Sequence, residues 1–377
     1  MSLIRSKFFH RPWLELTIML CATALSFAAL SVISFLSRPP ETGEMGSGAI
    51  TLWLLAFFML SFAIALISVL AGIGGGVIFT PVMMAFTPVD SLVIRATGLI
   101  VAMFSGLMAS GIFMKKGTGN LKICITVTVS QGSGALIGAQ TAIVAANAFG
   151  DAGDGALRIV LGCLLLGVSV YFFRGGKKLE WPDIQNIDSL TKWLKLEHSY
   201  FEESDGKVHS YKIRHILPAL ILVLGIGFLG GFFGMGAGWA ITPVQNLVLG
   251  VPLKAAMANS VLIIGMVDCV AVWPYMLAGG IIPLFVLPWL SAQIAGGYLG
   301  ALALVKVRVT VVRFILIGIM VFTGFSLTSD GLARLGLTAR VPGVLSVLVF
   351  LLIMALDSIL IFRMLRKEAE TKSTTPL

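Results

Sequence analysis

Long apolar runs dominate this chain. Most of them reach the roughly 20 residues that a helix needs to cross a bilayer, and they are continuous, unlike the short alternating strands of a membrane β-barrel. Only 12% of the residues are charged, whereas soluble domains carry roughly 25%. We therefore predict an all-α polytopic membrane protein. The runs lie at about 14–36, 50–71, 77–89, 91–114, 121–148, 156–173, 216–233, 239–250, 254–278, 282–304, 310–328 and 342–365.

The basic residues indicate how the chain crosses the bilayer. Two runs, 77–89 and 239–250, are too short to span it, and each is expected to form a hairpin with the long run before it. Most of the 27 Lys and Arg residues then lie in the tails and connections of one side, as in cytoplasmic loops. Both termini and the polar stretch 174–214 are therefore predicted to be cytoplasmic. The net charge of +9 is explained without a nucleic-acid partner.

The polar stretch is expected to contain a short amphipathic helix at 188–198 and a hairpin at 199–213. The hairpin would turn at Asp205-Gly206, a favoured two-residue turn. Its expected role is to tether two membrane halves, with a regulatory platform as the alternative. The predicted organisation is a tail, first membrane helix and outer loop at 1–49, repeat 1 at 50–173, the cytoplasmic loop at 174–214, repeat 2 at 215–330, and a last helix with a cytoplasmic tail at 331–377.

The two halves are related by an internal repeat. Displacing the sequence by 162 positions aligns 70–140 with 232–302 without a gap. Glycines, both Thr-Pro pairs and a glutamine coincide, which composition alone would rarely produce. Three crossings separate equivalent points, so the second copy is expected to enter the bilayer from the opposite face. Such inverted repeats with broken or re-entrant half-helices are common in secondary transporters.

Each copy has a glycine cluster before its short run, at 72–76 and 234–238. Such clusters interrupt a helix, and within a bilayer an interruption is tolerated only where protein or a watery cavity surrounds it. Thr80-Pro81 and Thr242-Pro243 follow, and we expect each threonine to cap a half-helix whose first position is the proline. The amide ends would then face the breaks at mid-bilayer and attract an anion. Close helix packing is the alternative explanation of the glycines.

A few polar side chains lie within the runs. Gln131 and Gln293 could donate to an oxyanion or tie helices together. Asp268 is a proton-coupling candidate, because an intramembrane carboxylate is costly to keep, and a structural acceptor is the alternative. Arg95 could attract an anion or anchor its helix at the interface. The predicted substrate-binding residues are Gly74, Gly75, Gly76, Thr80, Pro81, Thr97, Gln131, Gly236, Ala237, Gly238, Thr242, Pro243, Asn259, Ser260 and Gln293.

These motifs resemble the sulfite exporter TauE/SafE family. The likeness rests on the two glycine clusters with their Thr-Pro pairs, and on Arg95-Ala96-Thr97 and Ala258-Asn259-Ser260, which are similar to the family's Ala-x-x-Thr-Ser stretch. It covers roughly residues 55–330. The resemblance implies a bacterial inner-membrane transporter of small sulfur oxyanions or organosulfonates, often sulfite leaving the cell. Ala237, Asn259 and Gly98 depart from the family pattern, which bears on the substrate more than on the fold.

The predicted function is a secondary active transporter that exports such an anion by alternating access. An uncoupled anion channel with the same site is the alternative. An intramembrane enzyme is not expected, because no histidine lies in a run and Asp268 is the only deeply placed acid. No cofactor or metal is predicted. The expected partners are a small anion (sulfite, thiosulfate or an organosulfonate) and the lipid bilayer, with no nucleic acid, and a homodimer is one option for the oligomeric state.

Overall fold

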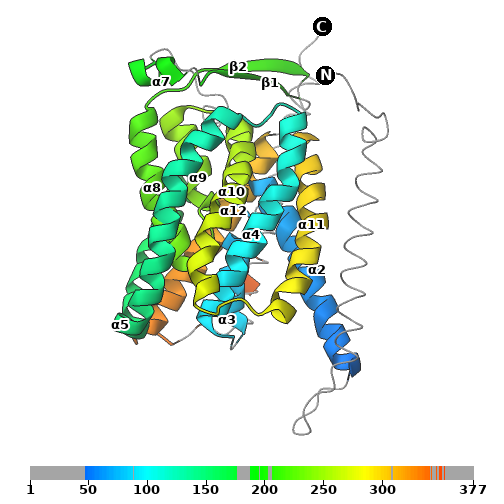
Figure 1. The fold of residues 1–377 in the computed structure, drawn as a ribbon, viewed down its shortest axis with the longest axis vertical. Helices are drawn as coiled ribbons and strands as arrows, with labels where there is room; N and C mark the ends of the chain where they lie inside the picture. Colours follow the sequence, from blue (N-terminus) through cyan, green and yellow to red (C-terminus); the bar gives the residue numbers. More distant parts are fainter. Residues whose placement is uncertain are drawn as a thin grey trace.

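The computed structural model describes residues 47–87, 89–175, 187–194, 196–202, 206–306 and 309–339, with isolated positions beyond them. The predicted membrane helix at 14–36 lies outside the described residues, as does most of the run at 342–365. The described part is a bundle of long helices with a small hairpin across one end (Figure 1). The helical elements of the bundle are α2 (Ser47–Ala71), α3 (Gly76–Phe86), α4 (Ser91–Lys115), α5 (Leu121–Gly175), α8 (Ile216–Phe233), α9 (Gly238–Val244), the π-helical η2 (Gln245–Leu249), α10 (Leu253–Leu277), α11 (Pro283–Lys306) and α12 (Val309–Arg334).

Six helical segments among the described residues are long and apolar enough to cross a membrane. They belong to α2, α4, the first part of α5, α8, α10 and α11. Large apolar side chains cover the outside of the bundle, for example Leu52, Val129 and Ile221, whose exposed fractions are 68%, 68% and 67%. Lipid solvates such a surface, whereas in water it would drive association. The all-α polytopic membrane fold predicted from the sequence is confirmed.

Helix α5 is too long for a single crossing. Its 55 residues would extend roughly 80 Å as a straight helix, against a hydrocarbon core of roughly 30 Å. Its early part packs on α8, where a Cβ at Gly138 would come 1.9 Å from the Phe228 carbonyl oxygen. Its later part packs on α12, where a Cβ at Gly162 would come 2.7 Å from the Gly324 carbonyl oxygen. We therefore treat α5 as two membrane crossings. The first packs closely on α8 and the second on α12, each at a glycine.

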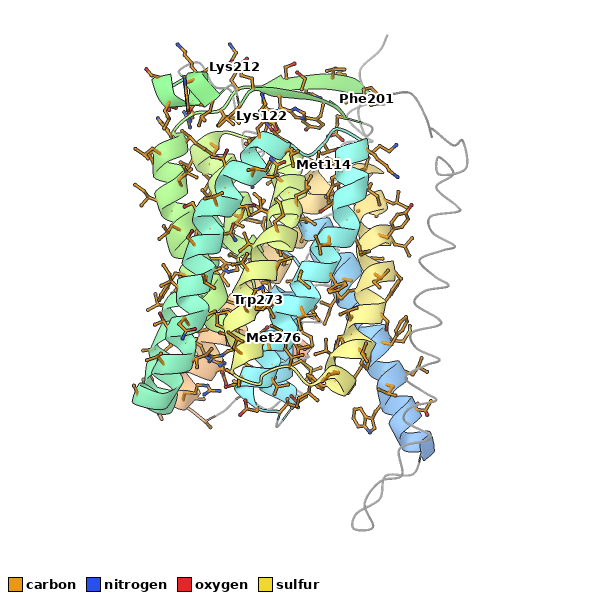
Figure 2. The ribbon with its side chains drawn as sticks, in the orientation of Figure 1. Met114, Lys122, Phe201, Lys212, Trp273 and Met276 are labelled. Atoms are coloured by element: carbon orange, nitrogen blue, oxygen red, sulfur yellow. The ribbon has the colours of Figure 1, made fainter. Side chains whose placement is uncertain are left out.

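The displacement of 162 positions recurs in the element boundaries. Helix α4 begins and ends 162 positions before α10, and α3 begins 162 positions before α9. Glycines with positive φ recur at the same interval, at Gly72 and Gly234 and at Gly74 and Gly236. The equivalent residues Met114 and Met276 lie towards opposite ends of the bundle (Figure 2), which is the arrangement that an inverted repeat would produce.

One end of the bundle is covered by residues 187–194, 196–202 and 206–215, which we call the platform (Figure 1). It contains α7 (Ser189–Leu194) and the antiparallel strands β1 (His198–Glu202) and β2 (Lys207–Tyr211), so the helix and hairpin predicted for this stretch are present. Asn120 Nδ2 donates to the Leu196 carbonyl oxygen (3.1 Å), and the Arg214 amide donates to the Leu249 carbonyl oxygen (3.1 Å). The platform is therefore joined to the start of α5 and to the end of η2.

A buried ion pair also fixes the platform to α10. Lys254 Nζ donates to the Glu202 carboxylate of β1 and to the Val305 carbonyl oxygen of α11 (2.7 Å). We expect Lys254→Ala to lower the free energy of unfolding by about 3–5 kcal/mol, because it removes the ammonium from a buried carboxylate. Thermal unfolding of the detergent-purified protein measures the loss. Lys212→Ala is the matched control, because Lys212 lies exposed on the platform (Figure 2), and equal losses in both variants would contradict the account.

Candidate functional site

The two glycine breaks, 72–75 and 234–237, lie against each other inside the bundle. A Cβ at Gly76 would come 2.8 Å from the Met235 carbonyl oxygen, and a Cβ at Gly238 would come 2.2 Å from the Ile73 carbonyl oxygen. Every residue of both breaks is buried. No side chain fits at these two glycines without moving the opposite break, so the sequence requirement for glycine arises from contact between the two breaks.

Each threonine of the Thr-Pro pairs bonds the opposite break. Thr80 Oγ1 donates to the Gly234 carbonyl oxygen (2.9 Å), and Thr242 Oγ1 donates to the Gly72 carbonyl oxygen (3.1 Å). The prediction that these threonines cap the half-helices is wrong, because α3 and α9 begin four residues earlier and their N-cap residues make no side-chain cap bond. The break carbonyls lack a helical donor, and the hydroxyl from the other repeat supplies one.

The prolines are likewise not at the helix starts. Pro81 lies inside α3, and Pro243 lies inside α9, which continues directly into η2. Ala237, the N-cap position of α9, is buried in the second break. The structure has half-helices at 76–86 and 238–249, close to the short runs predicted at 77–89 and 239–250, and the expectation that they start at the prolines is wrong.

Both half-helices begin with unpaired backbone amides. In α3, the amides of Gly76 and Val77 have no hydrogen-bond acceptor among the described residues, and the same holds for Gly238 and Trp239 in α9. The first amides of a helix find no partner within it, so buried ones need an acceptor from outside. The helix dipole adds a partial positive charge at this end. The two starts therefore offer donors to a negatively charged group.

Two ionisable side chains approach the second break. A Cβ at Gly236 would lie 2.8 Å from Asp268 Oδ2, and that oxygen is buried without a hydrogen-bond partner among the described residues. Arg95 of α4 packs against Gly234, and its guanidinium donates to the Phe232 carbonyl oxygen (3.3 Å) and lies over the Phe232 ring. One acid and one base thus lie beside the same interruption.

The two predicted glutamines offer different atoms. Gln293 Nε2 donates to the backbone oxygen (3.0 Å) and hydroxyl (2.9 Å) of Ser61, and its Oε1 lies 2.9 Å from where a Gly75 Cβ would be. Gln131 is fully buried, and neither its Oε1 nor its Nε2 has a partner among the described residues. Gln131 can therefore donate to an oxyanion, whereas Gln293 presents an acceptor in this conformation.

The side chains of two predicted residues, Thr97 and Asn259, hydrogen-bond elsewhere than at the breaks. Thr97 Oγ1 donates to the Val93 carbonyl oxygen of its own helix (2.8 Å). Asn259 bonds Asn120 and Gln245 near the platform, whereas its neighbour Ser260 donates to the Gly238 carbonyl oxygen (3.4 Å) and does lie at the second break. Thr97 and Asn259 were selected for their positions near helix starts and for their likeness to the family stretch, and neither clue says which way a side chain points.

Sequence reasoning missed two serines at the site. Ser105 Oγ accepts from the Gly75 amide (3.3 Å), and Ser61 holds Gln293 as described above. Neither serine stands out in an apolar run, because serine is common in membrane helices where it bonds its own backbone. Ser105 becomes a candidate only in the structure, where its helix α4 places it beside Gly75 of the first break.

Comparison with known proteins adds the family. The family model described as "Sulfite exporter TauE/SafE" matches residues 54–327. The chain is also 25% identical over 271 residues to the "Probable membrane transporter protein YunE" of Bacillus subtilis (strain 168). This match covers 70% of this chain and 93% of that protein. No solved structure matches the chain.

Proposed function

The chain belongs to the sulfite exporter TauE/SafE family, and we propose that it is a secondary active transporter of a small sulfur oxyanion such as sulfite, or of an organosulfonate. Family membership makes it a membrane transporter or permease. The proposal adds the substrate class, export as the direction, and a bacterial inner membrane with both termini and the platform on the cytoplasmic side. Transport without a chemical reaction is sufficient for this role.

The observation that carries the proposal is the set of unpaired amides at the starts of the two half-helices. Gly76 and Val77 start one half-helix, and Gly238 and Trp239 start the other. An oxyanion has several acceptor oxygens and can satisfy donors from both sides. The Arg95 guanidinium, which donates to the Phe232 carbonyl oxygen two residues before the second break, supplies positive charge nearby. Such a site favours a compact anion over a cation or a neutral solute.

The close contact of the breaks supports alternating access. A Cβ at Gly76 would come 2.8 Å from the Met235 carbonyl oxygen, and a Cβ at Gly238 would come 2.2 Å from the Ile73 carbonyl oxygen. The breaks must separate before an anion can reach all the amides, and a movement of this kind exposes a site to one side at a time. A permanently open channel would need a continuous path between the breaks, which this packing opposes.

The relation between the halves supports an inverted repeat. Several contacts at one break have counterparts 162 positions away at the other. They are the two threonine bonds, and the packing of position 95 on Gly234 and of position 257 on Gly72. Met114 and Met276, equivalent by the same displacement, lie towards opposite ends (Figure 2). Two copies related in this way can exchange conformations, and each exchange would open the opposite side.

Asp268 is the proposed proton carrier. It is 1% exposed, lies beside the second break and has no counterpart in the first repeat, where Gly106 occupies the equivalent position. A buried carboxylate that gains and loses a proton next to an anion site couples the two by charge, because each change alters the field at the site.

The test is counterflow in proteoliposomes that contain the purified full chain. Vesicles loaded with unlabelled sulfite are diluted into radiolabelled sulfite, with methanesulfonate and sulfate as competitors. The expected result is a transient accumulation of label above equilibrium, because exchange across a carrier outpaces net loss. Simple equilibration that follows the membrane voltage would indicate the uncoupled channel, and no flux of sulfite or methanesulfonate would refute the substrate class.

A further inference from the structure

The two half-helices differ in polarity beyond their first turns. Gln245 and Asn246 lie in η2, whereas the equivalent residues of α3 are Met83 and Met84, and all four side chains are buried. The second half-helix changes to π geometry at this point, and π-helical turns are frequent at functional sites. Buried amides need hydrogen-bond partners that buried methionines do not. The polar half-helix is also the one that ends beneath the platform.

Gln245 belongs to a connected buried cluster. The Asn120 backbone amide, which can only donate, bonds Asn259 Oδ1 (2.7 Å), and this orients Asn259 Nδ2 towards Gln245 Oε1 (3.0 Å). The Gln245 amide is therefore turned so that its Nε2 is left over. That nitrogen has no partner among the described residues, although the Gln245 side chain is 0% exposed.

Tyr211 of β2 adds a second donor to the cluster. Its hydroxyl lies beside the side chains of Asn120 and Asn259 and is buried without a hydrogen-bond partner among the described residues. Burial raises the pKa of this hydroxyl, so Tyr211 keeps its proton at neutral pH and can donate. A buried donor without an acceptor is costly. The Tyr211 hydroxyl of the platform and Gln245 Nε2 of the bundle are both such donors, and both residues lie next to Asn259.

We propose that this cluster is a second anion subsite on the platform side of the breaks, in which Gln245 Nε2 and the Tyr211 hydroxyl donate to a small oxyanion. The inference rests on the proposed function. It adds a second binding site for the anion, on the path between the central breaks and the platform. Neutral donors suit such a binding site, because an anion on a transport path must be bound strongly enough to enter and weakly enough to leave. The equivalent positions of α3 are Met83 and Met84, so this pair of buried amides is present in one half-helix only.

Equilibrium dialysis of the purified full chain against radiolabelled sulfite tests the subsite. The wild type is expected to show two classes of binding site. Tyr211→Phe, which deletes a single oxygen, and Gln245→Leu are expected to weaken the second class by about three- to tenfold, the effect of one lost hydrogen bond. The first class should stay within about twofold of the wild type.

Met83→Leu is the matched control, because Met83 is the repeat equivalent of Gln245 and should leave both classes unchanged. Thermal unfolding establishes that each variant is folded, and Tyr211→Phe keeps the test valid if Gln245→Leu unfolds. A single class of site in the wild type, or equal weakening of both classes in the two variants, would overturn the subsite and leave the proposed function standing. Absence of any sulfite binding by the wild type would refute both.

Discussion

Gly238→Ala is expected to abolish sulfite binding and counterflow. A Cβ at this position would come 2.2 Å from the carbonyl oxygen and 2.5 Å from the carbonyl carbon of Ile73 in the opposite break. The two breaks would have to move apart, and their amides could no longer converge on one anion. Overpacking of this kind costs typically about 1–3 kcal/mol, so the variant should insert and purify with a lower melting temperature.

The matched control is Gly225→Ala in α8, where an added Cβ would have nothing within 4 Å. Helix propensity alone should make that variant as stable as the wild type or slightly more stable. Binding and counterflow are measured for both variants, together with thermal unfolding. Sulfite binding by Gly238→Ala at wild-type affinity would show that the contact between the breaks is packing without a role in the site.

Asp268→Asn is expected to remove the dependence of transport on a proton gradient. Asparagine has nearly the shape of a protonated carboxyl group, so the site should keep its form while losing the ability to release a proton. We expect the stimulation of sulfite flux by an imposed pH gradient to fall by at least about tenfold, the size of a typical coupling between two sites. Counterflow without a gradient should remain, because exchange needs no net proton movement.

Asp90→Asn serves as the control for the loss of a carboxylate. Asp90 is exposed and caps α4 by accepting from the Leu92 amide (2.7 Å), a role that asparagine also fills well. The two variants are compared for flux with and without the pH gradient. Gradient-driven flux that persists in Asp268→Asn would place the coupling elsewhere, and loss of counterflow in that variant would make Asp268 a structural residue.

The sequence was most informative where physical constraints are strict. Apolar runs of bilayer length have few alternatives, so α2, α4, α8, α10 and α11 lie within a few residues of the predicted runs. Glycines that recur with Thr-Pro at a fixed interval predicted both breaks, and positive φ at Gly72, Gly74, Gly234 and Gly236 explains why glycine is used there. The hairpin of the platform followed from its turn residues.

Side-chain direction was the part that sequence could not give. Thr80 and Thr242 precede prolines as helix caps do, yet they bond carbonyls that belong to the other repeat. Gln131 and Gln293 are equivalent in the alignment, but Ser61 turns only Gln293 so that its oxygen faces the break. Contacts between residues more than 150 positions apart decide each case, and no local pattern records them.

The most direct test of the central claim is a crystal structure of the full chain with selenite, the selenium analogue of sulfite, analysed by anomalous scattering. The account predicts a selenium peak between the two breaks, within hydrogen-bond distance of the amides of Gly76 or Val77 from one repeat and of Gly238 or Trp239 from the other. If, at saturating selenite, selenium is bound elsewhere and these amides contact only protein atoms, the account is contradicted.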